Sequence, residues 1–264
     1  MLTRDDGLEG KVALISGGSS GIGASLAVLY AKAGCDSVIS YIEADGHDPQ
    51  VVVKAVEAEG RRCIAVPCDV SSAADVEKFA QTALDEFGRI DIAVAMAGIL
   101  RRAPLEDMTD ERFNDMLDID LVGVLRLFRS AAARMIDGGA MVAASSIAGG
   151  HYGWEEHVHH AAAKSGIQGL CRSLAVELAP RKIRVNTIIP GLIESPQSLD
   201  GNNSLGKDGL DAASSYIPWD GLAPPKNAHA RFASSPPMTQ RLSPASNLLL
   251  TVDKPCVGLA RPLA

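Results

Sequence analysis

The sequence lacks any apolar run of about 18 residues, the length at which a helix can cross a bilayer. It also lacks a basic cluster, because its 25 lysines and arginines are scattered along a chain with a net charge of −7. The first absence predicts a protein without a membrane span, and the second disfavours a nucleic-acid surface. Since the N-terminal stretch MLTRDDGLEG is polar, we expect no signal peptide and a cytoplasmic location.

Paired cysteine motifs are absent as well. Five cysteines, an odd number without CxxC spacing, favour reduced buried thiols over a disulfide framework or a zinc site. A histidine-rich stretch raises the alternative of a metal site on His151, His157, His159 and His160. No carboxylate or thiol signature accompanies these histidines, so we predict no metal. We assign His151, Tyr152 and Trp154, with His157, to the wall of a pocket on a loop.

Short apolar runs alternate with segments of helical length. The runs occupy residues 11–16, 37–41, 63–70, 91–98, 140–146 and 184–191. This rhythm is typical of a parallel sheet covered by helices on both faces. With 264 residues and 47% hydrophobic content, the chain can bury one sizeable core. We therefore predict a single α/β domain over residues 1–264.

Two helices can be predicted in some detail. Residues 72–87 open with Ser72 as N-cap, carry apolar residues at helical spacing and stop at Gly88. Residues 161–178 form the second helix, which ends before Pro180. Its apolar stripe contains Ile167, Leu170, Cys171, Leu174, Ala175 and Leu178. Such a stripe packs against a core or a second subunit, so this helix is available for a dimer.

A glycine-rich turn follows the first apolar run and opens a helix, in SGGSSGIGASLAVLYAKAG. Gly17, Gly21 and Gly23 leave room for a pyrophosphate to approach the backbone, and the helix N-terminus supplies amide donors and a positive dipole end. The alternative is an ordinary glycine-rich turn between a strand and a helix.

The spacing GxxxGxG resembles that of the classical short-chain dehydrogenase/reductase family, and further family landmarks occur in order between residue 8 and about residue 219. Asp69 in CDV matches the adenine contact, Ala97-Gly98 the end of the NNAG motif and Ser146 in AASSIAG the catalytic serine. Lys164 matches the catalytic lysine, and Pro190-Gly191 with Ile193 and Ser195 match the nicotinamide loop. Ser146 is assigned to polarising a carbonyl, since the GxSxG pattern of a serine nucleophile is absent.

The resemblance implies a single-domain Rossmann fold, a doubly wound parallel sheet of about seven strands flanked by helices, with NAD or NADP at the carboxyl ends of the strands. It also implies a homodimer or homotetramer. The residues that it assigns to the cofactor are Gly17, Ser19, Ser20, Gly21, Ile22, Gly23, Tyr41, Asp69, Val70, Ala97, Gly98, Lys164, Pro190, Gly191 and Ile193.

The end of the second apolar run bears on the choice between NAD and NADP. NAD-selective enzymes place an acid there to bind the ribose hydroxyls, whereas this chain has Tyr41. No arginine or lysine follows in YIEADGHD, and none lies in the glycine turn. The missing acid favours NADP slightly. Tyr41 could equally do no more than flank the adenine pocket.

The chain departs from the family at the residues that move protons. The family's Asn, Ser, Tyr and Lys correspond to Asp120, Ser146, His160 and Lys164, and Ala95-Met96 replace the two asparagines of NNAG. The Lys164 ammonium should lower the pKa of His160, leaving a neutral ring that is a better base than acid. Since imidazole is shorter than a phenol, a water or Tyr152 would complete the relay. A carboxylate at Asp120 should pair with Lys164.

Two functions remain open at this stage. The first is an NAD(P)-dependent oxidoreductase that interconverts a ketone and a secondary alcohol by hydride transfer, with an impaired or altered proton relay. The second is a dinucleotide-binding protein of the same fold without redox turnover, or with a different reaction in the pocket. Both take a small molecule and neither needs a nucleic acid or a membrane.

The resemblance ends past Trp219. Prolines at 224, 225, 236, 237 and 244 would interrupt the helix expected there. Codons can be chosen so that a shifted frame over residues 231–246 resembles the family, and we hypothesise that residues 220 to about 247 are out of frame. This puts a second subunit interface in doubt. We assign residues 195–247 to a substrate lid and a divergent segment, and LLLTVD at 248–253 to the last strand.

Overall fold

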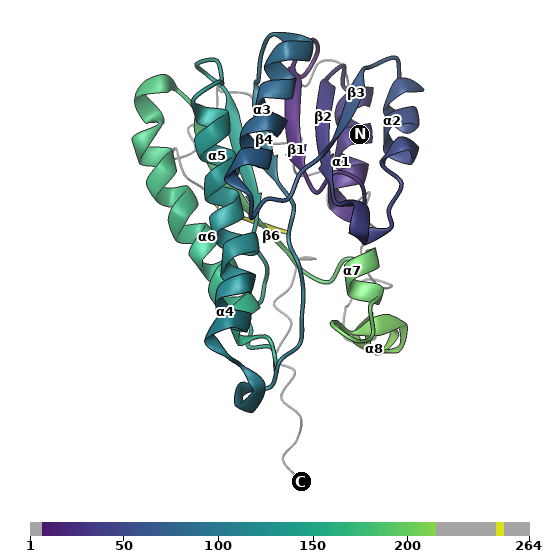
Figure 1. The fold of residues 1–264 in the computed structure, drawn as a ribbon, viewed down its shortest axis with the longest axis vertical. Helices are drawn as coiled ribbons and strands as arrows, with labels where there is room; N and C mark the ends of the chain where they lie inside the picture. Colours follow the sequence, from purple (N-terminus) through teal and green to yellow (C-terminus); the bar gives the residue numbers. More distant parts are fainter. Residues whose placement is uncertain (1–6, 215–246, 251–264) are drawn as a thin grey trace.

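Seven parallel strands form one sheet in the order β3-β2-β1-β4-β5-β6-β7. The structure, a computed structural model, describes residues 7–214 and 247–250 (Figure 1). The strands are β1 (Val12–Ser16), β2 (Asp36–Tyr41), β3 (Cys63–Pro67), β4 (Ile92–Ala95), β5 (Ala140–Ala144), β6 (Arg184–Pro190) and β7 (Asn247–Leu250). Six of them lie within residues 7–214, and β7 extends the sheet by pairing with β6, from Thr187↔Asn247 to Pro190↔Leu250. The predicted doubly wound parallel sheet is confirmed.

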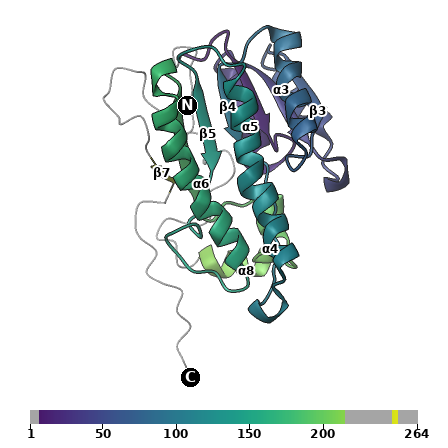
Figure 2. The ribbon, with the colours of Figure 1, turned by 60° about the vertical axis from the view of Figure 1, so that its left-hand side comes forward.

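Helices cover both faces of the sheet (Figures 1 and 2). The helices are α1 (Gly21–Lys32), α2 (Pro49–Glu57), α3 (Ala73–Phe87), α4 (Asp110–Leu117), α5 (Gly123–Ala132), α6 (Val158–Glu177), α7 (Pro196–Leu199) and α8 (Gly206–Ser214). Helices α1 and α2 pack on one face, while α3, α5 and α6 pack on the other. A π-helical turn, Asp118–Val122, joins α4 to α5.

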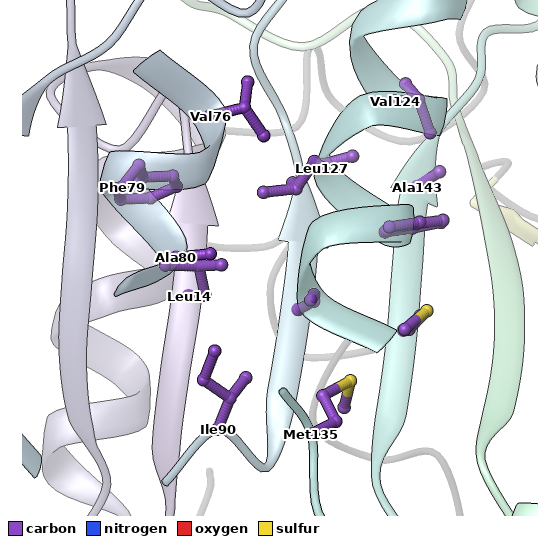
Figure 3. Packing of buried hydrophobic residues seen from close by; sticks show 14 of the residues in the cluster. Leu14, Val76, Phe79, Ala80, Ile90, Val124, Leu127, Met135 and Ala143 are labelled. Atoms are coloured by element: carbon purple, nitrogen blue, oxygen red, sulfur yellow. The ribbon is translucent and has the colours of Figure 1, made fainter. Parts of the chain in front are cut away.

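Alternate residues of each central strand enter two separate cores. Leu14 of β1 packs with Phe79 of α3 and Leu127 of α5, as Figure 3 shows, whereas Ala13 and Ile15 pack with α1 and α2. Because both faces of the strand are covered, both sets of side chains must be apolar. This double covering explains the continuous apolar runs in the sequence.

The two helices predicted in detail are confirmed in their packing. Ser72 caps α3 by accepting a hydrogen bond from the Asp75 amide, and Gly88 ends that helix in a left-handed conformation. The stripe of α6 packs against the core, with Ile167, Cys171 and Ala175 fully buried. The predicted start at Ala161 is wrong, because α6 begins at Val158. His159 and His160 turn inward there, so their burial extends the helix by a turn.

The substrate lid is described only in its first part, residues 195–214, which contains α7 and α8. These two helices contact each other, and Pro196 at the start of α7 lies beside Gly21 at the start of α1 (Figure 1). Apart from Asn247, the segment that we hypothesise to be out of frame lies outside the described residues, so that hypothesis stays a prediction. Within residues 7–214 and 247–250, no helix is long and apolar enough to cross a membrane.

Candidate active site

The carboxyl ends of the central strands bring the glycine turn against the loop after β4. Gly17 has a φ of +63°, and a Cβ there would lie 2.7 Å from the Ala97 amide nitrogen. The Ser16 hydroxyl accepts hydrogen bonds from the amides of Met96 and Ala97, at 3.2 Å each. A larger residue at position 17 would push these two loops apart. Gly17 and Ala97 therefore lie side by side.

The start of α1 is suited to a phosphate group. Gly21 has a φ of +52°, and a Cβ on Gly23 would lie 2.2 Å from the Gly17 carbonyl oxygen, so this tight approach requires glycine. Ser20 is extended at the N-cap position without a side-chain cap hydrogen bond in the described chain, and the first turn carries no acid. The amides at this helix end can thus point toward an anion. The residues present fit a dinucleotide pyrophosphate.

A shallow pocket opens beside this helix end. Its lining residues are Gly21, Ala24, Ser25, Glu194, Ser195, Pro196 and Leu199. The lid enters the pocket through Ser195, whose Cβ would lie 3.7 Å from a Cβ on Gly21. Gln197 on α7 also donates to the Gly98 carbonyl at 3.5 Å. The lid therefore lies over the place where the glycine turn meets the loop after β4.

The residues expected around the adenine lie at the ends of β2 and β3. Tyr41 is half-buried and neighbours Pro67 across the sheet. Asp69 is exposed, and its carboxylate accepts hydrogen bonds from the Ser71 amide and hydroxyl at 2.8 and 2.7 Å. Val70 is buried. This arrangement leaves Asp69 at the surface with one carboxylate oxygen engaged by Ser71.

One buried carboxylate is shared by the two candidate catalytic nitrogen groups. Asp120 is fully buried in the π-helical turn, and its Oδ2 lies 3.0 Å from Lys164 Nζ and 3.7 Å from His160 Nδ1. Its other oxygen, Oδ1, accepts the Ile99 amide at 2.8 Å. Lys164 Nζ also donates to the Ala144 carbonyl at 3.4 Å. The predicted pairing of Asp120 with Lys164 is confirmed.

Burial decides the protonation of His160. Desolvation is the largest cause that lowers its pKa from 6.5 to about 3, followed by the charges of Lys164 and His157. The sequence pointed to Lys164 alone, which is the second cause and not the first. Among the described residues His160 Nδ1 has no hydrogen-bond partner within range. The ring is therefore neutral at pH 7, and the Asp120 charge favours the tautomer with its proton on Nδ1.

The loop that carries Ser146 is fixed against α6 through its neighbours. The buried Ser145 hydroxyl donates to the Lys164 carbonyl at 2.7 Å and accepts from Gln168 at 3.2 Å. The Ile147 amide donates to the Pro190 carbonyl at 3.1 Å. Ser146 itself is half-buried, and its hydroxyl accepts the Ala148 amide at 3.1 Å. The structure thus brings Asp120, His160 and Lys164 together, with Ser146 on the adjoining loop.

The wall loop, residues 146–157, runs from β5 to α6 and contains the predicted pocket residues. His151 is exposed, whereas Tyr152 and Trp154 are half-buried. Trp154 stacks on His157 with ring centroids 4.0 Å apart and meets His160 edge-on at 6.3 Å. Trp154 therefore connects this loop to a candidate catalytic side chain.

No group of three or more metal-ligating side chains occurs in the part of the chain that the structure describes. Cys35, Cys63, Cys68 and Cys171 are free and buried. Burial raises the pKa of the Cys171 thiol to about 11, so this thiol is unreactive at neutral pH.

Sequence reasoning missed one residue that organises the site, Ser145, and one contact of His157, a residue that it had assigned only to the pocket wall. Ser145 contacts α6 from the position before Ser146, and the repeated serine gave no reason to choose it. His157 is fully buried and reaches Asn203, which lies 46 positions away. A contact across such a separation leaves no local pattern, although the HVHH stretch did single out the region.

Fold and site together define an α/β oxidoreductase that binds a nicotinamide dinucleotide. The family profile described as enoyl-(acyl carrier protein) reductase matches residues 17–231. An oxidoreductase of Methylorubrum extorquens is 33% identical over 214 residues, covering 80% of this chain and 82% of that protein. An NAD-dependent oxidoreductase of Mycobacterium tuberculosis is 35% identical over 210 residues, covering 74% and 76%.

Solved structures agree with these relatives. A short-chain dehydrogenase of Burkholderia cenocepacia in complex with NADP has a TM-score of 0.83 at 30% identity, over 92% of this chain and 96% of that one. The chain belongs to the short-chain dehydrogenase/reductase family, and it is an NAD(P)-binding enzyme of that family.

Proposed function

We propose that this enzyme interconverts a ketone and a secondary alcohol by hydride transfer, with a proton relay in which His160 replaces the family's tyrosine and Asp120 its asparagine. The observation that carries the proposal is the shared carboxylate, with Asp120 Oδ2 3.0 Å from Lys164 and 3.7 Å from His160. A family site that used a phenol would need the ammonium to lower its pKa. Here a neutral imidazole already stands beside the lysine.

The geometry favours oxidation of the alcohol. A nicotinamide cofactor supplies the hydride acceptor when bound, and the substrate hydroxyl must lose its proton to a base on the protein. His160 offers the Nε2 lone pair if Asp120 keeps the proton on Nδ1. Ser146 orients the substrate oxygen. Lys164 donates one N–H to the Asp120 carboxylate and one to the Ala144 carbonyl, which leaves its third N–H available for the cofactor ribose.

Reduction of a ketone needs a proton that neutral His160 does not readily give. A bridging water, or Tyr152 on the wall loop, would supply it. We therefore expect slow carbonyl reduction compared with a family member that has the intact tetrad, by about 100-fold or more, which is the usual contribution of a general acid.

Restoration of the family residues tests this proposal. The double variant Asp120→Asn with His160→Tyr should speed ketone reduction and shift its pH optimum, and each single variant should restore less. The assay uses NADH and NADPH with a panel of ketones and secondary alcohols. A double variant with wild-type rates of both ketone reduction and alcohol oxidation would contradict the proposed proton relay.

The cofactor-binding set is also part of this proposal, and the residues are those that the family resemblance assigned. The glycine turn and the uncapped start of α1 support Gly17, Ser19, Ser20, Gly21, Ile22 and Gly23. Tyr41 in the place of an acid favours NADP slightly. Calorimetric titration with NAD and NADP decides the preference, and tighter binding of NAD would reverse it.

A second function is supported by the same site. Because burial holds His160 neutral and Asp120 engages Lys164, the proton relay could be inactive while the dinucleotide still binds. Cofactor binding without turnover over a broad panel of carbonyls and alcohols would favour this reading, which is a dinucleotide-binding protein or a non-redox catalyst.

We further propose a homodimer that uses α6, and we place the protein in the cytoplasm. Val176 supports the dimer, since 71% of this apolar residue is exposed on α6. The four buried free thiols support a reducing compartment.

A further inference from the structure

His157 joins two segments that are distant in sequence. The ring is fully buried just before α6, where Nδ1 lies 2.6 Å from the Glu155 carbonyl oxygen and Nε2 lies 3.1 Å from the Asn203 carbonyl oxygen. Glu155 belongs to the wall loop, whereas Asn203 belongs to the lid between α7 and α8. One imidazole therefore spans the junction between wall loop and lid.

The chemistry of these two contacts fixes the form of the ring. A carbonyl oxygen can only accept a hydrogen bond, and a neutral imidazole has one N–H donor and one lone pair. A neutral ring would thus point a lone pair at one of the two oxygens. Only the imidazolium donates to both Glu155 and Asn203.

Trp154 supplies the stabilisation that a buried cation needs. Its ring lies 4.0 Å from the His157 ring and 13° from parallel, so the indole face covers the imidazole. A cation over an aromatic face is favourable, and more so where water is excluded. This stacking offsets part of the cost of removing the charge from water.

The surrounding charged groups are consistent with one positive ring among three histidines. On α6, burial is the largest cause that lowers the pKa values of His159 and His160; the His157 charge comes next for His159, whereas for His160 it follows the charge of Lys164. On the lid, Asp200 accepts the Asn203 side-chain amide at 2.9 Å. Beside the wall loop, Arg102 pairs with Glu156 at 3.0 Å.

The remaining buried charges nearby are Asp120 and Lys164, which pair with each other. No described carboxylate bonds directly to the His157 ring, so its two carbonyl partners and Trp154 are what hold it.

We propose that His157, as an imidazolium, is a positioning residue that fastens the substrate lid to the wall loop and, through Trp154, holds His160 in the pocket. The substrate role of the lid rests on the proposed function, but the fastening itself does not. When His157 loses its proton, one of its two contacts becomes repulsive. The lid should then open more often as pH rises.

Hydrogen exchange of the lid amides tests the proposal in the whole protein. His157→Phe keeps a ring against Trp154 but removes both donors, so protection at residues 199–206 should fall about tenfold at low pH, as expected for losing a charged hydrogen bond. In the wild type, protection should fall toward the variant's value as pH rises and the ring loses one of its two N–H donors.

The matched control is His151→Phe, because His151 is an exposed ring of the same loop. It should leave lid protection and its pH dependence at wild-type values. Equal lid protection in wild type and His157→Phe at every pH would overturn the proposal.

A second measurement uses the wild type alone and does not depend on a variant that folds. Nitrogen NMR of the ¹⁵N-labelled ring should show both His157 nitrogens protonated at about pH 5.5. One unprotonated nitrogen there would overturn the proposal. Neither measurement needs turnover, so an inactive protein with a pH-dependent lid would contradict the proposed reaction and leave this inference standing.

Discussion

At the scale of single residues, the site depends on a carboxylate that no water can reach. Asp120 is fully buried, and it balances the ammonium of Lys164 while lying near the His160 ring. A buried charge is stable only if it is paired, so each member of this group limits what the others can become. The proton relay and the local stability are therefore governed by the same three side chains.

Acid should destabilise the protein partly through His160. Its pKa is lowered from 6.5 to about 3, so between these values the unfolded chain binds a proton that the native protein does not. The free energy of unfolding therefore keeps its full value, as far as His160 is concerned, above about pH 6.5 and decreases as pH falls toward 3. His160→Phe should flatten this dependence by a few kcal/mol, measured by urea unfolding from pH 4 to 7. An identical slope in both proteins would contradict the assignment.

Removing one partner of the buried pair should cost more than removing both. Asp120→Leu leaves the Lys164 ammonium without its counter-ion and the Ile99 amide without its acceptor, and should destabilise the protein by about 3–5 kcal/mol. The double variant Asp120→Leu with Lys164→Met should recover a large part of that loss. Denaturant unfolding of the two single variants and the double variant measures the coupling. Additive losses would show that the pair does not interact.

The sequence could predict which residues form this site, but not how burial sets the pKa of His160. An ion pair was predicted because Asp120 occupies the position of the family's asparagine near the lysine, and a carboxylate attracts the Lys164 ammonium. It could not show that burial outweighs the Lys164 charge at His160, since covering side chains come from separate elements. His157 was invisible as a lid contact because Asn203 lies in another segment.

At the scale of elements, the strands were predicted in their number and order along the chain, while the ends of strands and helices were missed by up to three residues. Both faces of the sheet are covered, so the central strands are marked by unbroken apolar runs. The start of α6 was missed by three residues, because polar histidines pack inward where the pattern predicts a loop. The glycine turn was predicted from its spacing, and its close approaches explain why glycine is needed there.

A negative charge at the start of α1 should stabilise the free protein but weaken cofactor binding. Ser20 makes no side-chain cap bond in the described chain, so Ser20→Asp should stabilise the free protein by about 0.5–1 kcal/mol through capping and the helix dipole. The same carboxylate should repel a pyrophosphate and weaken dinucleotide binding at least tenfold. Thermal unfolding and calorimetry measure the two effects.

Thr109→Asp is the control for this variant, because Thr109 caps α4 by accepting the Arg112 amide. It should leave dinucleotide affinity unchanged. If Ser20→Asp bound the dinucleotide with wild-type affinity, the pyrophosphate would not bind at the start of α1.

At the scale of the whole molecule, the outer side of α6 bears on how subunits associate. Helix α6 buries Ile167, Cys171 and Ala175 against the sheet, and Val176 projects outward near its end. Exposed single apolar residues are common, but one on a helix that also frames the active site makes a subunit contact there consequential.

Val176→Lys should weaken the proposed homodimer. A charged side chain costs more to bury in an apolar contact than it gains, so the dissociation constant should rise about tenfold or more. Sedimentation velocity over a concentration series measures the change. Identical sedimentation of variant and wild type, both dimeric, would place the interface elsewhere.

The π-helical turn between α4 and α5 has a further consequence. A π turn accommodates one residue more than the corresponding α turn, so it offsets the azimuth of α4 from that of α5 by roughly 100°. That offset lets Leu127 of α5 point at the sheet while Asp120 points at α6. A deletion of one residue from Asp118–Val122 would bring the two helices back into phase and swing the carboxylate away from Lys164. The extra residue of the π-helical turn thus determines that the Asp120 carboxylate faces Lys164.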